Sequence, residues 1–181
     1  MTPARLWRDV AIPLFPRTIV TMKLLTRRIN VILFCGFFFI IDRWLKWQAL
    51  HGWAADRLLN RWFGWHPFLN PGVAFGIPVP AWLIILLTIP IILLLGYLVT
   101  MSFAERGAHN VEPVQLERYA LCATRYALIF AGALSNLIDR VLYGHTVDYI
   151  LIFTGVINLA DVMIVFGFVI YFFCSRKSIK S

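Results

Sequence analysis

Four long apolar runs constrain the fold of this chain more than any other feature. A helix needs about 20 apolar residues to cross a hydrocarbon core of about 30 Å. None of the runs alternates strictly between apolar and polar residues over the length of a barrel strand, so each is expected to form an α-helix. The runs cover residues 29–47, 81–101, 119–138 and 156–174.

The composition supports a membrane protein. Hydrophobic residues make up 60% of the chain and charged residues 14%, against about half and about a quarter in soluble domains. The length of 181 residues suits a single domain. The sequence therefore predicts an all-α membrane protein whose domain, residues 29–175, contains four transmembrane helices. The segment that begins at Met22 would be a normal N-terminus for a membrane protein, so we interpret residues 1–21 as an upstream extension.

Basic residues at both ends indicate the orientation. Lysine and arginine collect on the cytoplasmic side of membrane proteins, so both termini are predicted to be cytoplasmic, in basic segments 1–28 and 176–181. Residues 48–80 and 141–155 then face outward. These ends account for most of the net charge of +8, and we expect no nucleic-acid partner. The basic residues are Arg5, Arg8, Arg17, Lys23, Arg27 and Arg28 before the first run, and Arg176, Lys177 and Lys180 after the last.

Polar side chains from separate runs share one layer near the predicted outer surface. With a helical rise of about 1.5 Å per residue, Asp42 and Asp161 each lie roughly 20 Å from the cytoplasmic face, and Asn136 lies about 26 Å from it. Burying an ionised group at the bilayer centre costs at least about 2.5–3.5 kcal/mol, so each is a functional candidate. The layer also contains Asp139 and Arg140 at the outer boundary and Asp148 on the loop before the last run.

The spacing of these residues favours a shared cavity. Asn158 and Asp161 stand three positions apart and face the same way, and Asp42 with Lys46 forms an i, i+4 pair. A purely structural polar network would show the same spacings, so both interpretations stay open here. Asn136, Asp139 and Arg140 likewise share one helical face.

Asp148 and Asp161 suggest a reaction if they lie close together. Two adjacent carboxylates share a proton, so that one activates water while the other polarises a carbonyl, as in aspartic proteases. A serine mechanism has little support, because no histidine stands near Ser135 in the sequence. The four histidines form no zinc signature. The alternative class is a transporter with a proton or cation pathway, although such sites usually lie near the midplane.

Five motifs follow one another along the chain: DRWLKW, NPGVAFG, GALSNLIDR, VDYI and INLAD. Together they resemble the bacterial lipoprotein signal peptidases, the type II signal peptidases, over about residues 29–175. The resemblance implies an aspartic endopeptidase of the inner membrane, with its active site near the periplasmic face. It would cut diacylglyceryl-modified prolipoproteins before the lipidated cysteine and release the signal peptide. It also implies a small extracytoplasmic β-cradle and a short interfacial helix beside the four spans.

The resemblance also assigns roles to individual residues. Asp148 and Asp161 would be the catalytic pair, which needs no metal or other cofactor. The enzyme is expected to act as a monomer in contact with membrane lipid. The remaining matched positions are Asn136 and Arg140, which would line the site; Asp139 and Asn158, which would support it; Asp42 and Lys46, a structural polar pair; and Asn70, Gly72, Ala74 and Phe75, in the loop that would hold the substrate.

Overall fold

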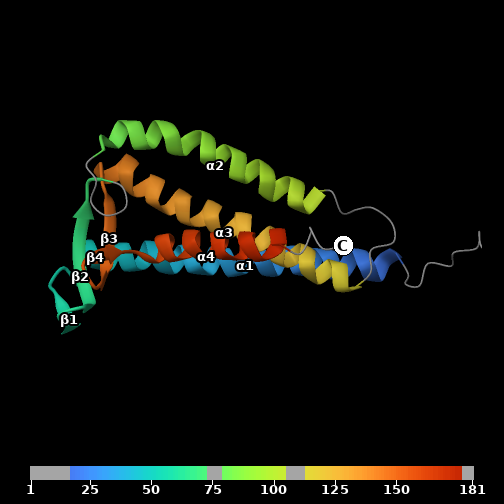
Figure 1. The fold of residues 1–181 in the computed structure, drawn as a ribbon, viewed down its shortest axis with the longest axis horizontal. Helices are drawn as coiled ribbons and strands as arrows, with labels where there is room; N and C mark the ends of the chain where they lie inside the picture. The colour runs from blue at the N-terminus through green and yellow to red at the C-terminus, as the bar shows by residue number, and fades with distance from the viewer. Residues whose placement is uncertain (1–16, 73–78, 105–112, 177–181) are drawn as a thin grey trace, which may run out of the picture.

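The computed structural model describes residues 17–72, 79–104 and 113–176, which form four helices and four strands. The helices run along the long axis of the molecule, and a small sheet crosses one end of them (Figure 1). In chain order the elements are α1 (Arg17–Leu50), β1 (Arg57–Asn60), β2 (Phe63–Asn70), α2 (Ala81–Ala104), α3 (Pro113–Tyr143), β3 (Thr146–Ile152), β4 (Gly155–Ile157) and α4 (Leu159–Arg176).

The first three predicted runs are helical throughout, whereas the fourth begins in strand β4 and becomes helical only from Leu159. Several helices extend beyond the predicted bounds. Helix α1 begins at Arg17 rather than near Ile29, and α3 continues to Tyr143. Of the helices in the described ranges, one is long and apolar enough to cross a membrane by length and composition, Ala81–Ser102 in α2. A shorter apolar helix covers Leu159–Phe173. Helices α1 and α3 contain more charged residues than α2, because they include members of the predicted polar layer such as Asp42 and Asp139.

The sheet joins two segments that lie far apart in the sequence. Its strands are all antiparallel in the order β1-β2-β3-β4, so β2 from the first outer segment pairs with β3 from the last. The expected small sheet is therefore present, and Asp148 lies on β3 rather than on the predicted loop. Residues 51–72 and 79–80 contain strands and no helix, so the expected interfacial helix is absent from the described part of this segment.

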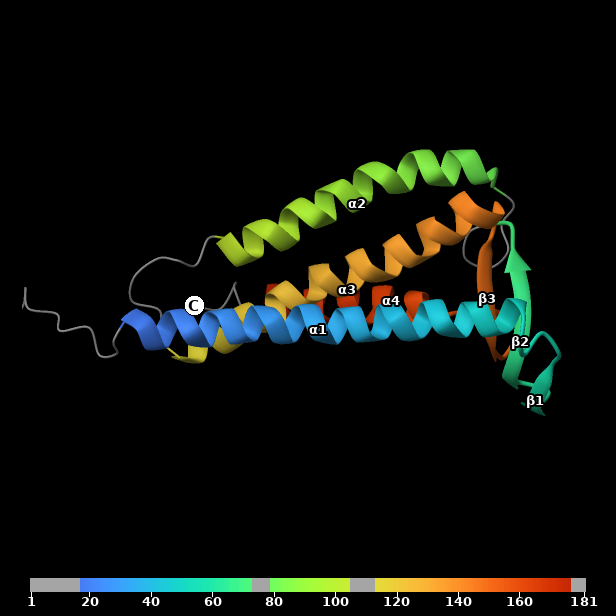
Figure 2. The same ribbon diagram turned by 180° about the vertical axis from the view of Figure 1, so that it is seen from behind.

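Helix α3 lies between the other helices, and its contact with α4 is especially close (Figure 2). A Cβ atom on Gly132 would collide with the backbone oxygen of Ala160, and one on Gly167 would lie 2.8 Å from the oxygen of Arg125. Small residues let membrane helices approach backbone to backbone. Gly132 thus brings the start of α4 against α3, near Asn136, and Gly167 allows a close approach farther along the two helices. The buried apolar cluster between the helices contains Val31, Cys35, Ala127, Leu128, Ala131 and Met163.

We predict that Gly132→Ala destabilises the protein. Its methyl group would push the first turn of α4 away from α3, and such overpacking costs about 1–3 kcal/mol. Gly36→Ala on α1 is the matched control, because a Cβ atom there meets nothing within 4 Å. Thermal unfolding in detergent should show a lower midpoint for Gly132→Ala only. Equal midpoints for the two variants would contradict the close-packing argument.

Candidate active site

Reciprocal hydrogen bonds close the first turn of α4. The backbone N–H of Asp161 donates to Asn158 Oδ1 at 2.9 Å, and the backbone N–H of Asn158 donates to Asp161 Oδ2 at 3.2 Å. Asn158 is therefore the N-cap residue and Asp161 the third helical residue of a capping box. The positive end of the helix dipole also favours a carboxylate at this position. The local sequence INLAD thus holds the Asp161 carboxylate at the helix start.

Asp148 reaches the same region from the sheet. On β3 it pairs with Phe68, while Thr146 pairs with Asn70 on β2. Alternate residues of a strand share a sheet face, so Asn70 and Asp148 are diagonal neighbours. Asn70 Nδ2 donates to Asp148 Oδ2 at 2.9 Å, and Asp148 is 2% exposed. The pairing of β2 with β3 therefore supplies a hydrogen-bond donor to this buried carboxylate.

Two asparagine side chains connect the two carboxylates. Asn158 Nδ2 donates to Asp148 Oδ1 at 2.6 Å, in addition to the contacts of Asn158 with Asp161. Asn136 on α3 donates from Nδ2 to Asp161 Oδ1 at 2.8 Å, and its Oδ1 accepts from Asn158 Nδ2 at 3.2 Å. The elements α3, α4 and β3 thus meet at one hydrogen-bonded group. In it, Asn158 contacts both carboxylates.

The surroundings of Asp148 favour its protonated form. The pKa of the Asp148 carboxyl is raised to about 6, mainly by burial and also by the charge of the neighbouring Asp161. The hydrogen bonds from Asn70 and Asn158 act in the opposite direction, because donors stabilise the ionised form. A carboxyl group with this pKa can hold a proton near neutral pH and give it up during a reaction.

The buried ammonium group of Lys46 lies next to this site and contacts residues of α1 and α3. Lys46 is 1% exposed, and its Nζ forms ion pairs with Asp139 at 2.7 Å and with Asp42 at 3.2 Å. It also donates to Asn136 Oδ1 at 2.8 Å and to Ser135 Oγ at 3.3 Å. Because Lys46 Nζ donates a hydrogen bond to the side-chain oxygen of Asn136, the amide nitrogen of Asn136 faces Asp161. Lys46 therefore determines which end of Asn136 points into the site.

Among the other predicted residues, Arg140 and Gly72 form contacts that lead to Asn70. Arg140 Nη2 donates to the backbone oxygen of Gly72 at 3.3 Å, and the N–H of Gly72 donates to Asn70 Oδ1 at 3.0 Å. This chain of contacts ties the end of α3 to the residue that donates to Asp148. Ala74 and Phe75 lie outside the described residues.

Within the described ranges, no group of three or more His, Cys, Asp or Glu side chains is arranged to hold a metal ion.

Comparison with known proteins identifies the family. A family model described as signal peptidase (SPase) II matches residues 34–176, which is most of the chain. The chain belongs to the signal peptidase II family. Members of this family are proteases of lipoprotein processing, and the candidate site lies within the matched residues.

Individual relatives agree with this assignment. A lipoprotein signal peptidase of Brucella ovis is 36% identical over 147 residues, covering 71% of this chain and 78% of the relative. One from Mesorhizobium japonicum is 48% identical over 54 residues, covering 27% of this chain and only 32% of the relative. A solved bacterial membrane enzyme, determined by the in meso method, has a similar fold, with a TM-score of 0.66 and 24% identity. That alignment covers 83% of this chain and 90% of the solved chain.

Three residues of the site were not assigned a role from the sequence. The Tyr149 hydroxyl donates to Asp42 Oδ1 at 2.9 Å and accepts from the backbone N–H of Leu159 at 3.1 Å. Burial and the nearby Asp42 carboxylate raise the pKa of this tyrosine. Ser135 Oγ donates to Asp42 Oδ2 at 2.6 Å, and Arg43 forms an ion pair with Asp139. Each belongs to one of the five motifs, which was the available signal.

The contacts of Asp42 predict a structural role. Its carboxylate accepts from Tyr149, Ser135 and the backbone N–H of Ala160, and it pairs with Lys46. Asp42→Asn would leave a buried ammonium without one of its two carboxylates, and breaking a buried pair costs about 3–5 kcal/mol. We therefore expect a much lower unfolding midpoint in detergent.

Asp56→Asn is the control for that measurement. Asp56 pairs with His66 at 2.8 Å, but its side chain is 52% exposed, and an exposed pair contributes only about 0–1 kcal/mol. An Asp42→Asn protein as stable as wild type and yet inactive would contradict the structural role.

Proposed function

We propose that this chain removes the signal peptide from diacylglyceryl-modified prolipoproteins by aspartic catalysis, cutting before the lipidated cysteine. One observation carries the mechanism: Asp148 and Asp161 come from different elements and are joined through Asn158. Membership of the signal peptidase II family supports the cleavage of lipoprotein signal peptides. The catalytic use of these two carboxylates is our inference from their contacts and charge.

The surroundings of the two carboxylates suggest which one acts as the base. We assign the base to Asp161, which accepts from Asn136 Nδ2 and from the backbone N–H of Asn158 at the positive end of α4; these contacts favour its ionised form in opposition to its burial. In the active form Asp148, whose pKa is raised to about 6, holds the proton. Asp161 then takes a proton from water as the water oxygen bonds to the scissile carbonyl carbon. Asp148 gives its proton to the carbonyl oxygen.

The tetrahedral intermediate then collapses with the same groups in opposite roles. The carbon–nitrogen bond breaks, and the leaving amine takes the proton from Asp161. The hydroxyl on the carbon returns its proton to Asp148 as the carbonyl re-forms. This restores both carboxyl groups, so the reaction is balanced with water as the only other reactant. No cofactor is required by these steps.

The remaining residues of the site position the substrate and the carboxylates. Asn136 and Asn158 orient the pair through their amides, and Arg140 supports the loop that contains Asn70. Arg140 is half-buried, and we also assign its guanidinium to contact with the substrate backbone. We further assign Asp139, Asp42 and Lys46 to support beneath the site, and Gly72, Ala74 and Phe75 to the loop that holds the peptide.

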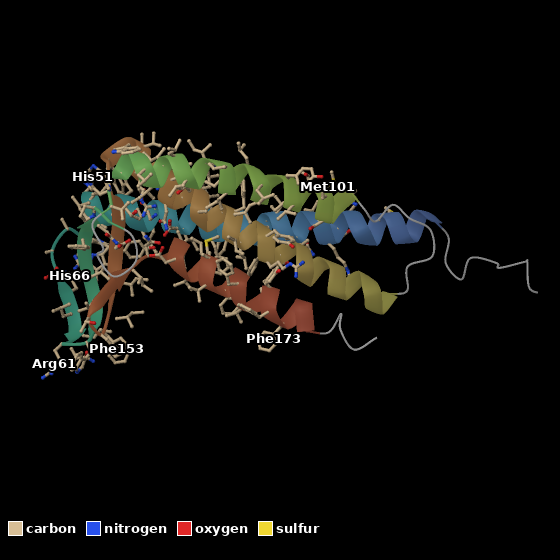
Figure 3. All side chains as sticks on the ribbon, turned by 45° about the horizontal axis from the view of Figure 1, so that its top comes forward. His51, Arg61, His66, Met101, Phe153 and Phe173 are labelled. Atoms are coloured by element: carbon tan, nitrogen blue, oxygen red, sulfur yellow. The ribbon has the colours of Figure 1, made fainter. Side chains whose placement is uncertain are left out.

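We also propose that the four helices span the inner membrane with both termini in the cytoplasm. The sheet and the catalytic pair would then lie at the periplasmic face, where a lipidated cysteine can remain in the bilayer during cleavage. The outward faces of the helices support contact with lipid, and Figure 3 shows Met101 on α2 and Phe173 on α4 away from the sheet. The enzyme would act as a monomer. Exposed apolar side chains include Ile32, Leu33, Leu87, Leu93, Phe172 and Phe173.

The first test is cleavage of a diacylglyceryl-modified prolipoprotein by purified protein in detergent. Asp148→Asn and Asp161→Asn should each lower kcat by about 10²–10⁴-fold, because each removes a proton-transfer group. Asp56→Asn should cleave at the wild-type rate, since its exposed carboxylate contacts His66 and no residue of the site. Near-normal turnover by the double Asp148→Asn, Asp161→Asn variant would exclude aspartic catalysis by this pair.

The proton on Asp148 predicts a pH dependence. As pH rises above about 6, Asp148 loses this proton and the acid for the carbonyl oxygen disappears, so kcat/KM should fall on the alkaline side. The hydrogen bond from Asn70 lowers this pKa. Asn70→Ala should therefore move the alkaline limb of the kcat/KM profile to higher pH. A limb that stays in place in this variant would show that another group titrates there.

A further inference from the structure

One edge of the sheet extends sideways past the helices. Figures 1 and 2 both show β1 and the adjoining end of β2 beyond the side of the helix bundle, at the level of the helix ends. Figure 3 places Arg61 and Phe153 together at this extremity. We call it the hairpin tip and define it as residues 57–63 and 152–155. In a membrane-embedded protein this overhang faces lipid rather than the helices.

The hairpin tip consists of two neighbouring turns that are hydrogen-bonded to each other. Phe63 pairs with Ile152 across β2 and β3, and the backbone N–H of Phe153 donates to the oxygen of Trp62 at 2.7 Å. Asn60 Oδ1 accepts from the backbone N–H groups of Trp62 and Phe63 at 2.8 and 2.9 Å. These hydrogen bonds hold the backbones of the two turns together.

That arrangement exposes apolar groups. Phe153 has a φ of 55°, a conformation that is unfavourable for a bulky residue, and it is still 59% exposed. Its ring contacts those of Phe63 and Trp62, with centroid distances of 5.0 and 6.2 Å, without being covered by them. Leu59 is 88% exposed. Strained backbone at an exposed aromatic residue points to a role in binding.

Two guanidinium groups accompany these aromatic rings. Arg61 lies over the Trp62 ring at 4.3 Å from its centroid, and Arg57 lies 5.6 Å from that of Trp53. Among the described residues neither arginine forms an ion pair, since the adjacent Asp56 is paired with His66. Aromatic rings next to arginines are typical of the membrane interface, where the cations meet lipid phosphates.

We propose that the hairpin tip binds anionic phospholipid headgroups of the outer leaflet beside the helices. Trp62 and Phe153 enter the interface, and Arg57 and Arg61 contact the phosphates. This rests on the membrane orientation given under the proposed function. The strands β2 and β3 run from the tip to the site, where Asn70 and Asp148 meet. Lipid bound at the tip thus sets the height of the catalytic carboxylate relative to the bilayer.

The test is fluorescence quenching of Trp62 in lipid nanodiscs that contain the full chain. Brominated phosphatidylglycerol and brominated phosphatidylcholine are compared at equal fractions. The chain has seven tryptophans, so the signal of Trp62 is the difference between wild type and Trp62→Phe. Each arginine near a lipid surface contributes about fivefold (about 1 kcal/mol) to anionic lipid binding. We expect stronger quenching by the anionic lipid.

Arginine variants decide whether that excess comes from the tip. Arg57→Gln with Arg61→Gln should remove most of the excess quenching, whereas Arg27→Gln with Arg28→Gln, at the far end of α1, should keep it. Equal quenching by the two lipids would overturn the proposal. So would a Trp62 signal that neither lipid quenches, as expected if a polypeptide covered the tip.

Cleavage in detergent separates this proposal from the proposed function. The Arg57→Gln, Arg61→Gln variant should cleave at the wild-type rate in neutral detergent, because its substitutions lie outside the catalytic site. In nanodiscs, anionic lipid should lower KM for wild type and leave this variant unchanged. A variant that responds to anionic lipid as wild type does would overturn the role of the arginines. Failure of wild-type cleavage in detergent would instead count against the proposed function alone.

Discussion

The buried ammonium of Lys46 is the constraint on which the site depends. A charge that is 1% exposed needs partners of opposite sign, and Asp42 and Asp139 provide them. Since Asp42 and Lys46 belong to α1 and Asp139 belongs to α3, this requirement joins the two helices at one level. The ammonium also orients Asn136, so the same interaction that holds the helices together directs an amide N–H toward Asp161.

The Asp42 carboxylate extends this connection to the two elements that carry the candidate catalytic residues. It accepts from the Tyr149 hydroxyl, next to Asp148 on β3, and from the N–H of Ala160, next to Asp161 on α4. Tyr149 in turn accepts from Leu159, in the first turn of α4. The separation of the two carboxylates is therefore set by the neighbouring Tyr149 side chain and Ala160 backbone N–H, which share Asp42 as their acceptor. Glycines between α3 and α4 allow that close approach.

Some expectations were local enough to be predicted and others were not. The helices were confirmed because apolar runs of that length have few alternatives, although Arg17 rather than Ile29 begins α1. The prediction of a loop at Asp148 was wrong. Strand β3 forms by pairing with β2, which is distant in the sequence, so no local pattern of residues indicates it. Asn158 and Asp161 share a face as predicted from their spacing, and the capping box explains why. Catalysis by Asp148 and Asp161 stays a prediction for both residues.

The sequence by itself determined the helices, the apolar surfaces and the narrow layer of polar groups. These follow from hydrophobicity and helical rise, which act over a few turns of one chain segment. Tertiary structure decided which atoms within the layer meet. Asn70 donates to Asp148 only because β2 pairs with β3, which follows it much later in the sequence. Tyr149 reaches Asp42 only because α1 packs against that sheet. Such contacts depend on long-range packing, which no local pattern of residues specifies.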